Sequence, residues 1–264
     1  MPAPQQTGTC LVTGASSGIG AAIAHELAAR GHSVTLVARR EERLVSIAAQ
    51  LASTHGVRAE AVRCDLTDPV ARASLADRLQ ALGLRVDVLV SNAGIGTHGR
   101  LVELNPSKEV EQVQLMCEAC VELCRVFAPT MVVRRSGAVL IVASLSAFQP
   151  VPNTATYGAA KAFLLSFGEA LHAELRPLGI TVSTLCPGPV RTEIFNADEK
   201  HPSERVFPAP AWLTAQRVAR DAVDGLAHNR RVIVPGYINR LLAKSGRLIP
   251  HGLQLRVIER FYRT

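Results

Sequence analysis

Residues 9–20, TCLVTGASSGIG, contain the junction that decides the fold class. The first five of them are apolar or β-branched, which predicts a buried strand. Glycine-rich sequence follows directly and opens an Ala-rich helical pattern over Gly18–Arg30. Glycines at such a turn let the backbone approach a phosphate group, and the N-terminus of the next helix offers free N–H groups to it. The stretch therefore predicts the first strand–helix unit of a dinucleotide-binding domain.

The alternation of strand and helix patterns continues along the chain. Runs rich in Val, Ile, Leu and Thr predict strands at Thr9–Thr13, Ser33–Ala38, Arg58–Arg63, Val86–Val90, Gly137–Ala143, Ile180–Cys186 and Arg231–Val234. Longer Ala- and Leu-rich patterns predict helices at Gly18–Arg30, Glu41–Thr54, Pro69–Ala81, Pro106–Arg134, Ala155–Pro177 and Thr214–Asn229. This order predicts a single α/β domain of the doubly wound Rossmann type, with a parallel sheet of about seven strands and helices on both faces.

We expect one domain over residues 1–264, with its core at residues 7–234. Proline-rich sequence over residues 193–212 is too irregular for a core element and predicts a substrate loop or lid. Residues 236–264 form a basic C-terminal tail, in which six Lys and Arg residues accompany a single acid, Glu259. A solvated tail, a membrane-surface contact, a subunit contact and a pocket rim all remain open for this segment.

The chain is basic, with 29 Lys and Arg against 22 Asp and Glu and a formal charge of +7. A positive surface attracts nucleic acid as well as phosphorylated small molecules. The sequence carries no nucleic-acid reading motif and no basic stretch interleaved with aromatic residues. We therefore expect a small-molecule substrate and no nucleic-acid partner.

Six cysteines are present, and Cys117, Cys120 and Cys124 share one face of a predicted helix. No His or fourth Cys accompanies them at ligand spacing, so no metal site is predicted. The other three lie in or beside predicted strands, where Cys packs as a small hydrophobe. Free thiols indicate a reducing compartment, and the N-terminal residues do not resemble a secretory signal. We therefore expect a cytoplasmic protein.

The second predicted strand ends at a basic pair, Arg39 and Arg40. An NAD site usually carries an acid there for the ribose 2′-hydroxyl, whereas a 2′-phosphate calls for Arg. Guanidinium pairs with phosphate in a forked geometry, and Ser16 or Ser17 would bond the same group. NADP(H) is therefore expected in preference to NAD(H). The alternative is two surface arginines at the start of a helix.

Two more strand ends face the same edge of the predicted sheet. Asp65 follows the third strand, where its carboxylate would touch the adenine edge. Asn92, Ala93 and Gly94 follow the fourth strand, where small residues let the backbone pass close to the cofactor. Ordinary turn chemistry is the alternative for both segments.

A candidate acid–base group lies later in the chain. Tyr157 and Lys161 are four residues apart in a helical pattern and therefore share a helix face. A free phenol has a pKa near 10, and a nearby ammonium with a positive nicotinamide would lower that pKa to about 7. Ser144 ends the fifth predicted strand, where its hydroxyl would hold a substrate oxygen. Ser146 is a competing hydroxyl nearby.

In combination, TGASSGIG, SNAG, Ser144, the Tyr157–Lys161 pair and CPGPVRT resemble the short-chain dehydrogenase/reductase family, and most of all its bacterial, NADP-preferring reductases of undetermined substrate. The resemblance implies hydride transfer between nicotinamide and an alcohol or carbonyl. Tyr157 would be the general acid/base, Ser144 would position the substrate, and Lys161 would bind the nicotinamide ribose and lower the pKa of Tyr157. The expected cofactor-binding set, including the last four residues implied by the resemblance alone, is Gly14, Ser16, Ser17, Gly18, Ile19, Gly20, Arg39, Arg40, Asp65, Leu66, Asn92, Ala93, Gly94, Tyr157, Lys161, Pro187, Gly188, Val190 and Thr192.

The expected substrate pocket is largely apolar. It lies between Ser144, Phe148, Ile95, Ile194 and Trp212. This lining predicts a lipophilic secondary alcohol or ketone, such as a steroid-like, acyl-chain or terpenoid compound.

The resemblance carries two further expectations. The protein would form a homodimer or homotetramer through the helices predicted at Pro106–Arg134 and Ala155–Pro177. Family members often carry an Asn in the first of these helices that extends a proton relay from the Lys, and Met116 stands at that position here. A thioether donates no hydrogen bond. The alternative function is therefore a catalytically weak or non-catalytic NADP(H)-binding sensor or scaffold.

Overall fold

Seven parallel strands form one sheet in the order β3-β2-β1-β4-β5-β6-β7. The strands are β1 (Gly8–Thr13), β2 (Val34–Ala38), β3 (Ala59–Arg63), β4 (Arg85–Ser91), β5 (Gly137–Val142), β6 (Ile180–Leu185) and β7 (Val232–Ile233). Every predicted strand is confirmed. The strand order reverses between β1 and β4, and ligands of doubly wound sheets bind at such a reversal.

The computed structural model describes residues 1–191, 207–248 and 252. The predicted cofactor contact Thr192, the predicted substrate contact Ile194 and most of the predicted loop at 193–212 lie outside these residues, as does the end of the tail.

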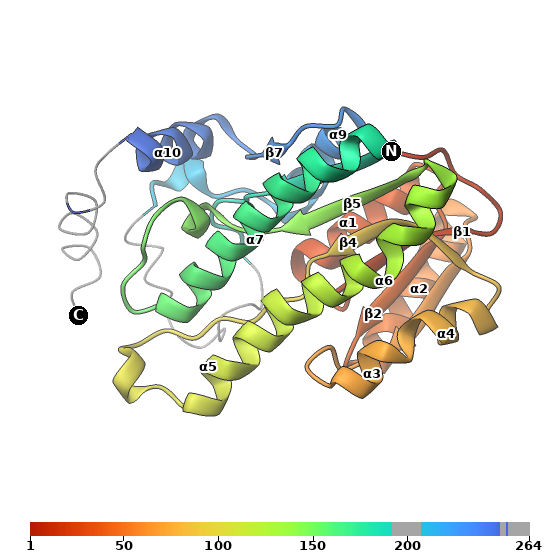
Figure 1. Ribbon diagram of the computed structural model, residues 1–264, viewed down its shortest axis with the longest axis horizontal. Helices are drawn as coiled ribbons and strands as arrows, with labels where there is room; N and C mark the ends of the chain where they lie inside the picture. Colours follow the sequence, from red (N-terminus) through yellow and green to blue (C-terminus); the bar gives the residue numbers. More distant parts are fainter. Residues whose placement is uncertain (192–206, 249–251, 253–264) are drawn as a thin grey trace.

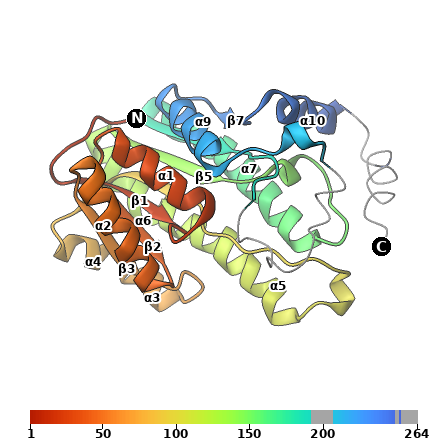
Figure 2. The same ribbon diagram turned by 180° about the vertical axis from the view of Figure 1, so that it is seen from behind.

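Helices cover both faces of the sheet (Figures 1 and 2). One face packs against α4 (Leu75–Ala81), α6 (Ala119–Arg134) and α7 (Ala155–Leu175), and the other against α1 (Gly18–Ala29), α2 (Glu41–His55) and α9 (Ala215–Ala227). Each face has its own core of aliphatic side chains. Every residue of β1 and β5 is buried, as expected for central strands covered on both sides.

Two predicted helices are interrupted in the structure. The pattern at 69–81 forms α3 (Pro69–Ala73) and then α4, and the two meet at Ser74, whose hydroxyl donates to the carbonyl of Ala71 (2.9 Å). The pattern at 106–134 forms α5 (Pro106–Val113), a π-helical turn η2 (Gln114–Glu118) and then α6. Such a turn accommodates an extra residue, which changes the direction of the side chains that it carries.

Short 3-10 turns and a last helix complete the described chain. The turns are η1 (Leu101–Glu103), η3 (Leu145–Phe148), η4 (Arg176–Leu178) and η5 (Ala209–Ala211). The predicted tail begins as a helix, α10 (Tyr237–Leu248), which contacts η3 and η5 and buries Asn239 and Ala243. No helix among the described residues is long and apolar enough to cross a membrane.

Candidate active site

The glycine-rich loop after β1 lies directly against the end of β4. A Cβ atom on Gly14 would lie 2.9 Å from Cα of Ala93, and Gly14 also has a positive φ of 63°. Only glycine fits both the space and the backbone angle. The predicted residues Gly18, Ile19 and Gly20 then form the first turn of α1.

Thr13, which the sequence analysis missed, ties the two strand ends together. Its hydroxyl accepts hydrogen bonds from the backbone N–H groups of Asn92 (2.9 Å) and Ala93 (3.1 Å) and donates to the carbonyl of Val90 (3.2 Å). The side-chain amide of Asn92 returns to the Thr13 carbonyl (2.9 Å). A threonine at the end of a strand before a Gly-rich turn is the only sequence signal for this role.

Arg40 lies over the glycine-rich loop. Its guanidinium donates to the Ser16 hydroxyl (2.9 and 3.2 Å) and to the Ser17 hydroxyl (2.9 Å). The Ser17 side chain makes no capping hydrogen bond to α1, so the first N–H groups of that helix stay available to an anion. The structure therefore brings together Arg40, Ser16 and Ser17, three residues of the predicted cofactor-binding set.

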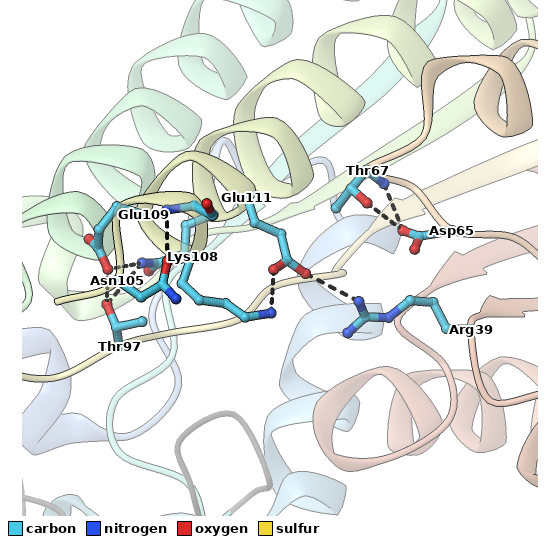
Figure 3. Close-up of polar contacts among 10 residues, drawn as sticks. Arg39, Asp65, Thr67, Thr97, Asn105, Lys108, Glu109 and Glu111 are labelled. Carbon is cyan, nitrogen blue, oxygen red and sulfur yellow. Dashed lines mark hydrogen bonds and ion pairs between the residues drawn. The ribbon is translucent and has the colours of Figure 1, made fainter.

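Arg39 points to a different partner (Figure 3). Its guanidinium pairs with Glu111 on α5 at 3.1 Å, and the second oxygen of Glu111 accepts from Lys108 at 2.6 Å. The Lys108 hydrogen bond lowers the pKa of Glu111, burial opposes that shift, and the charges of Lys108 and Arg39 add to the lowering. Glu111 is therefore a charged group at the predicted cofactor edge, and the sequence analysis did not single it out.

The residues after β3 are held in a turn. The Asp65 carboxylate accepts from the N–H (3.0 Å) and the hydroxyl (2.7 Å) of Thr67 (Figure 3). Burial raises the pKa of Asp65, but these hydrogen bonds and the charge of Arg39 outweigh it, so the net shift is downward. The neighbouring side chain of Leu66 is buried in the core. Asp65 therefore stabilises a turn, which was the alternative considered for it, and it also lies near enough to Arg39 to feel its charge.

Ser144, Tyr157 and Lys161 meet where β5 ends. Tyr157 hydrogen-bonds with Ser144. Lys161 donates to the carbonyl of Val142 (2.8 Å), and its Nζ lies 5.5 Å from the centre of the Tyr157 ring. The hydroxyl of Ser144 also accepts from the N–H of Ser146, which places Ser146 in the supporting turn η3 (3.1 Å).

This group is nearly dry, since 8% of Tyr157 and 2% of Lys161 are exposed. Burial raises the pKa of Tyr157 to about 12, and the hydrogen bond with Ser144 opposes that rise. Burial lowers the pKa of Lys161 to about 8. Removal from water penalises the charged form of both side chains, so each pKa shifts in the direction that favours the neutral form.

Met116 lies beside Lys161. A Cβ atom on Gly94 would be 3.4 Å from Sδ of Met116 and 3.6 Å from Nζ of Lys161. Met116 is 1% exposed and belongs to the π-helical turn η2. The thioether of Met116 and the ammonium of Lys161 therefore both lie against Gly94.

The CPGPV segment after β6 adjoins the same strand end. The carbonyl of Pro187 accepts from the N–H of Leu145 (2.9 Å), and Val190 pairs with Leu213 in a parallel bridge. Gly188 packs against Asn239 of α10, a residue that the sequence analysis did not select.

Four of the five predicted substrate residues are described, and Ser144 is the one already placed at the end of β5. Ile95 follows β4 and is partly buried, and Phe148 in η3 is partly buried against the core. Trp212 follows η5, with the guanidinium of Arg191 5.6 Å from its ring. Their convergence on one pocket remains a prediction. The described residues contain no group of three His, Cys, Asp or Glu side chains that could hold a metal ion.

A family model described as short chain dehydrogenase matches residues 8–203. The chain therefore belongs to the short-chain dehydrogenase family, and it is an oxidoreductase of the kind that acts on CH–OH or ketone groups.

One curated relative is similar to most of the chain. An uncharacterized oxidoreductase of Staphylococcus epidermidis is 33% identical over 228 residues, which are 85% of this chain and 93% of that protein. Some other curated relatives are longer, and the chain spans only 52% to 67% of their length.

Two solved structures show the same fold. A short-chain dehydrogenase of Sphingobium yanoikuyae in complex with NADPH is 33% identical, with a TM-score of 0.78 over 94% of this chain and 95% of that one. A bulky-bulky ketone specific alcohol dehydrogenase of Comamonas testosteroni is 28% identical, with a TM-score of 0.76 over 92% of this chain and 94% of that one.

Proposed function

We propose that the protein is an NADP(H)-dependent oxidoreductase that transfers a hydride between nicotinamide and a lipophilic secondary alcohol or ketone. The observation that carries the proposal is the group at the end of β5 in which the partly buried Ser144 meets the buried Tyr157 and Lys161. Tyr157 is hydrogen-bonded to Ser144 and lies near the ammonium of Lys161. Such a phenol can move a proton to or from a substrate oxygen.

In this proposal Tyr157 is the general acid/base. With its pKa raised to about 12, Tyr157 keeps its proton at neutral pH and is ready to donate it to a carbonyl oxygen that accepts from Ser144. NADPH, when bound, would supply the hydride, and its oxidised form would carry a positive charge into the site. For alcohol oxidation that charge and the Lys161 ammonium would have to lower the pKa of Tyr157 by several units. In the proposal, carbonyl reduction is the direction for which Tyr157 already carries the proton that it donates.

The cofactor assignment depends on two neighbouring places, the glycine-rich loop between β1 and α1 and Arg40 after β2. The glycine-rich loop has no room for a side chain at Gly14, and the start of α1 keeps free N–H groups for a pyrophosphate. Arg40, with Ser16 and Ser17, would hold a 2′-phosphate, and the NADPH bound by the Sphingobium relative supports that choice. Preference for NADP(H) over NAD(H) is part of the proposal.

A lipophilic substrate follows from the lining that we assign to the pocket. Ile95, Phe148 and Trp212 are apolar or amphipathic, and the Comamonas relative is named for bulky ketones. Residues 193–212 would form the loop over this pocket.

Assembly and location complete the proposal. Val121 and Val126 on α6 and Phe163 on α7 are exposed, and Phe163 stacks on Phe167 at 5.8 Å. These apolar side chains support a homo-oligomer formed through α6 and α7. Six free cysteines support a reducing compartment, and we place the protein in the cytoplasm.

The first experiment titrates the purified protein with NADPH and NADH by fluorescence and then follows NADPH oxidation with a panel of lipophilic ketones. Tyr157→Phe removes the proton donor but keeps the ring, so kcat should fall by about 10³-fold while the Kd for NADPH stays within about twofold. Turnover that survives Tyr157→Phe would refute the acid/base role. Tighter binding of NADH than of NADPH would refute the cofactor assignment.

A second candidate, an NADP(H)-binding protein with little turnover, is favoured by the position of Met116 beside Lys161. It predicts selective NADPH binding with no oxidation across the panel, and activity gained in Met116→Asn. Rapid turnover by the native protein would exclude it.

A further inference from the structure

Asn239 is a wholly buried carboxamide that no step above uses. It lies on α10 with 0% of its surface exposed. Its Nδ2 donates to the carbonyls of Ala211 (3.1 Å) and Pro235 (3.0 Å), while its Oδ1 is buried with no partner among the described residues. Burying a polar group without full pairing costs free energy, so a wholly apolar side chain would have been the simpler way to dock α10.

The carboxamide also lies flat against Gly188. A Cβ atom on Gly188 would come within 2.5 Å of Cγ, Nδ2 and Oδ1 of Asn239. Gly188 has no positive φ, so the need for glycine is steric and arises from Asn239. The Gly of the CPGPV segment therefore accommodates the C-terminal helix.

Asn239 thus contacts both segments that flank residues 192–206, which we call the two stems. Gly188 lies on the outgoing side after β6, and Ala211 lies on the returning side before α9. The two sides also bond to each other, from the N–H of Leu213 to the carbonyl of Pro189 (3.2 Å) and through the Val190–Leu213 bridge. One side chain therefore fastens both stems to α10.

The same backbone reaches the acid–base group. The carbonyl of Pro187 accepts from the N–H of Leu145, the residue after Ser144 (2.9 Å). A shift of Gly188 would therefore act on the turn that holds Ser144 as well as on the CPGPV backbone. No described contact links Asn239 to the Arg40 cluster at the other end of the site.

We propose that Asn239 is a positioning residue that sets the backbone of Gly188 and Ala211, and through it the nicotinamide half of the cofactor site. The proposal rests on the function proposed above, in which the CPGPV segment lies at the nicotinamide. It makes the C-terminal helix part of the active site and not a peripheral tail.

The test measures the two halves of the cofactor site separately. Asn239→Ala removes both donated hydrogen bonds and the contact with Gly188. The Kd for NADPH should rise about tenfold and kcat should fall about 10- to 100-fold, because small displacements of reacting groups are costly. The Kd for 2′,5′-ADP, which probes the adenine half alone, should stay within about twofold. A loss confined to the nicotinamide half separates positioning from general destabilisation.

Arg240→Leu is the matched control. Arg240 lies next to Asn239 on α10 and donates to the carbonyl of Val234 (3.0 Å). This hydrogen bond ties α10 to the residues after β7, which belong to neither stem. Its kcat and NADPH binding should remain those of the native protein.

A double-mutant cycle tests the contact itself. Gly188→Ala should impair NADPH binding in the native background, and much less in Asn239→Ala, where the space is open. Equal effects in both backgrounds would contradict the proposal. So would native-like NADPH binding by Asn239→Ala, or an equal loss of NADPH and 2′,5′-ADP binding.

Amide hydrogen exchange gives a readout that does not depend on the proposed function. Exchange at Leu145 and Leu213 should accelerate in Asn239→Ala and stay unchanged in Arg240→Leu, whose α10 is weakened elsewhere. If the native protein failed to bind NADPH, the proposed function would be refuted. This exchange pattern would still decide whether Asn239 holds the two stems in position. Asn239→Ser, which keeps one hydroxyl donor, replaces Asn239→Ala if that variant does not fold.

Discussion

The adenine end and the nicotinamide end of the proposed cofactor site are built in opposite ways. At the adenine end, the side chain of Arg39 is 55% exposed and pairs with Glu111, whose side chain is 17% exposed. At the nicotinamide end, Lys161 is 2% exposed and bonds to a single backbone carbonyl. The first end offers charges to a charged ligand in water, and the second holds its charge where water is excluded.

The difference has consequences for energy. Two unit charges 4 Å apart attract by about 1 kcal/mol in water and by about 4 kcal/mol at an effective dielectric constant of 20. Exposed charges are therefore replaceable and mainly select the ligand, whereas a buried charge acts strongly on its neighbour and is costly to lose. Substitutions at the dry end should affect chemistry, and those at the wet end should affect cofactor choice.

Among the substitutions that compare the two ends, the largest effect is expected at Lys161. Lys161→Met keeps much of the side-chain volume but removes the ammonium next to Tyr157, so kcat for ketone reduction should fall about 10²- to 10³-fold. Steady-state kinetics with NADPH, beside thermal unfolding to confirm the fold, would measure it. A loss that appears only in the Kd for 2′,5′-ADP would remove the distinction between the two ends.

Arg40→Leu should change cofactor selection and not chemistry. Hydrogen bonds to a charged group contribute about 1.5–3 kcal/mol, so the Kd for NADPH should rise about 10- to 100-fold, with NADH binding within about twofold. Arg43→Leu removes the same charge one turn further along α2 and controls for the general field. Equal losses for NADPH and NADH would show that Arg40 does not contact the 2′-phosphate.

The pH profile of ketone reduction reports the dry end alone. Tyr157, whose pKa is raised to about 12, stays protonated across the working range, whereas Lys161 loses its charge as pH rises through about 8. The kcat/KM should therefore be level below pH 8 and about tenfold lower at pH 9. An undiminished kcat/KM at pH 9.5 would mean that Lys161 keeps its proton in the working enzyme.

The smallest effect is expected at Glu111. Glu111→Gln releases Arg39 from a partly exposed ion pair that is worth about 0.2–1 kcal/mol, and it removes a negative charge near the proposed phosphate. NADPH should bind up to about fivefold more tightly, with NADH unchanged. Lys108→Met is the control, because Lys108 contacts Glu111 but not Arg39. Weaker NADPH binding in Glu111→Gln would show that Glu111 orients Arg39 instead of competing for it.

The sequence by itself determined the succession of strands and helices along the chain, since most strands are runs of aliphatic and β-branched residues and the helices follow longer Ala- and Leu-rich patterns. It also determined the groups that depend on local spacing. The glycine-rich turn follows β1 directly, Tyr157 and Lys161 lie one helical turn apart, and Ser144 ends a strand at the edge where ligands bind. These relations are short in the chain, so residue type and spacing were enough to predict them.

Only the tertiary structure decided the partners that come from distant segments. Glu111 reaches Arg39 from another helix, Thr13 joins β1 to β4, and Asn239 joins α10 to Gly188 and Ala211. The sequence presents Asn239 as one polar residue in a basic tail and gives no spacing that links it to Gly188. The tertiary fold also sets the burial that raises the pKa of Tyr157 and lowers the pKa of Lys161. Desolvation is a property of everything packed around a side chain, and it appears only when the chain is folded.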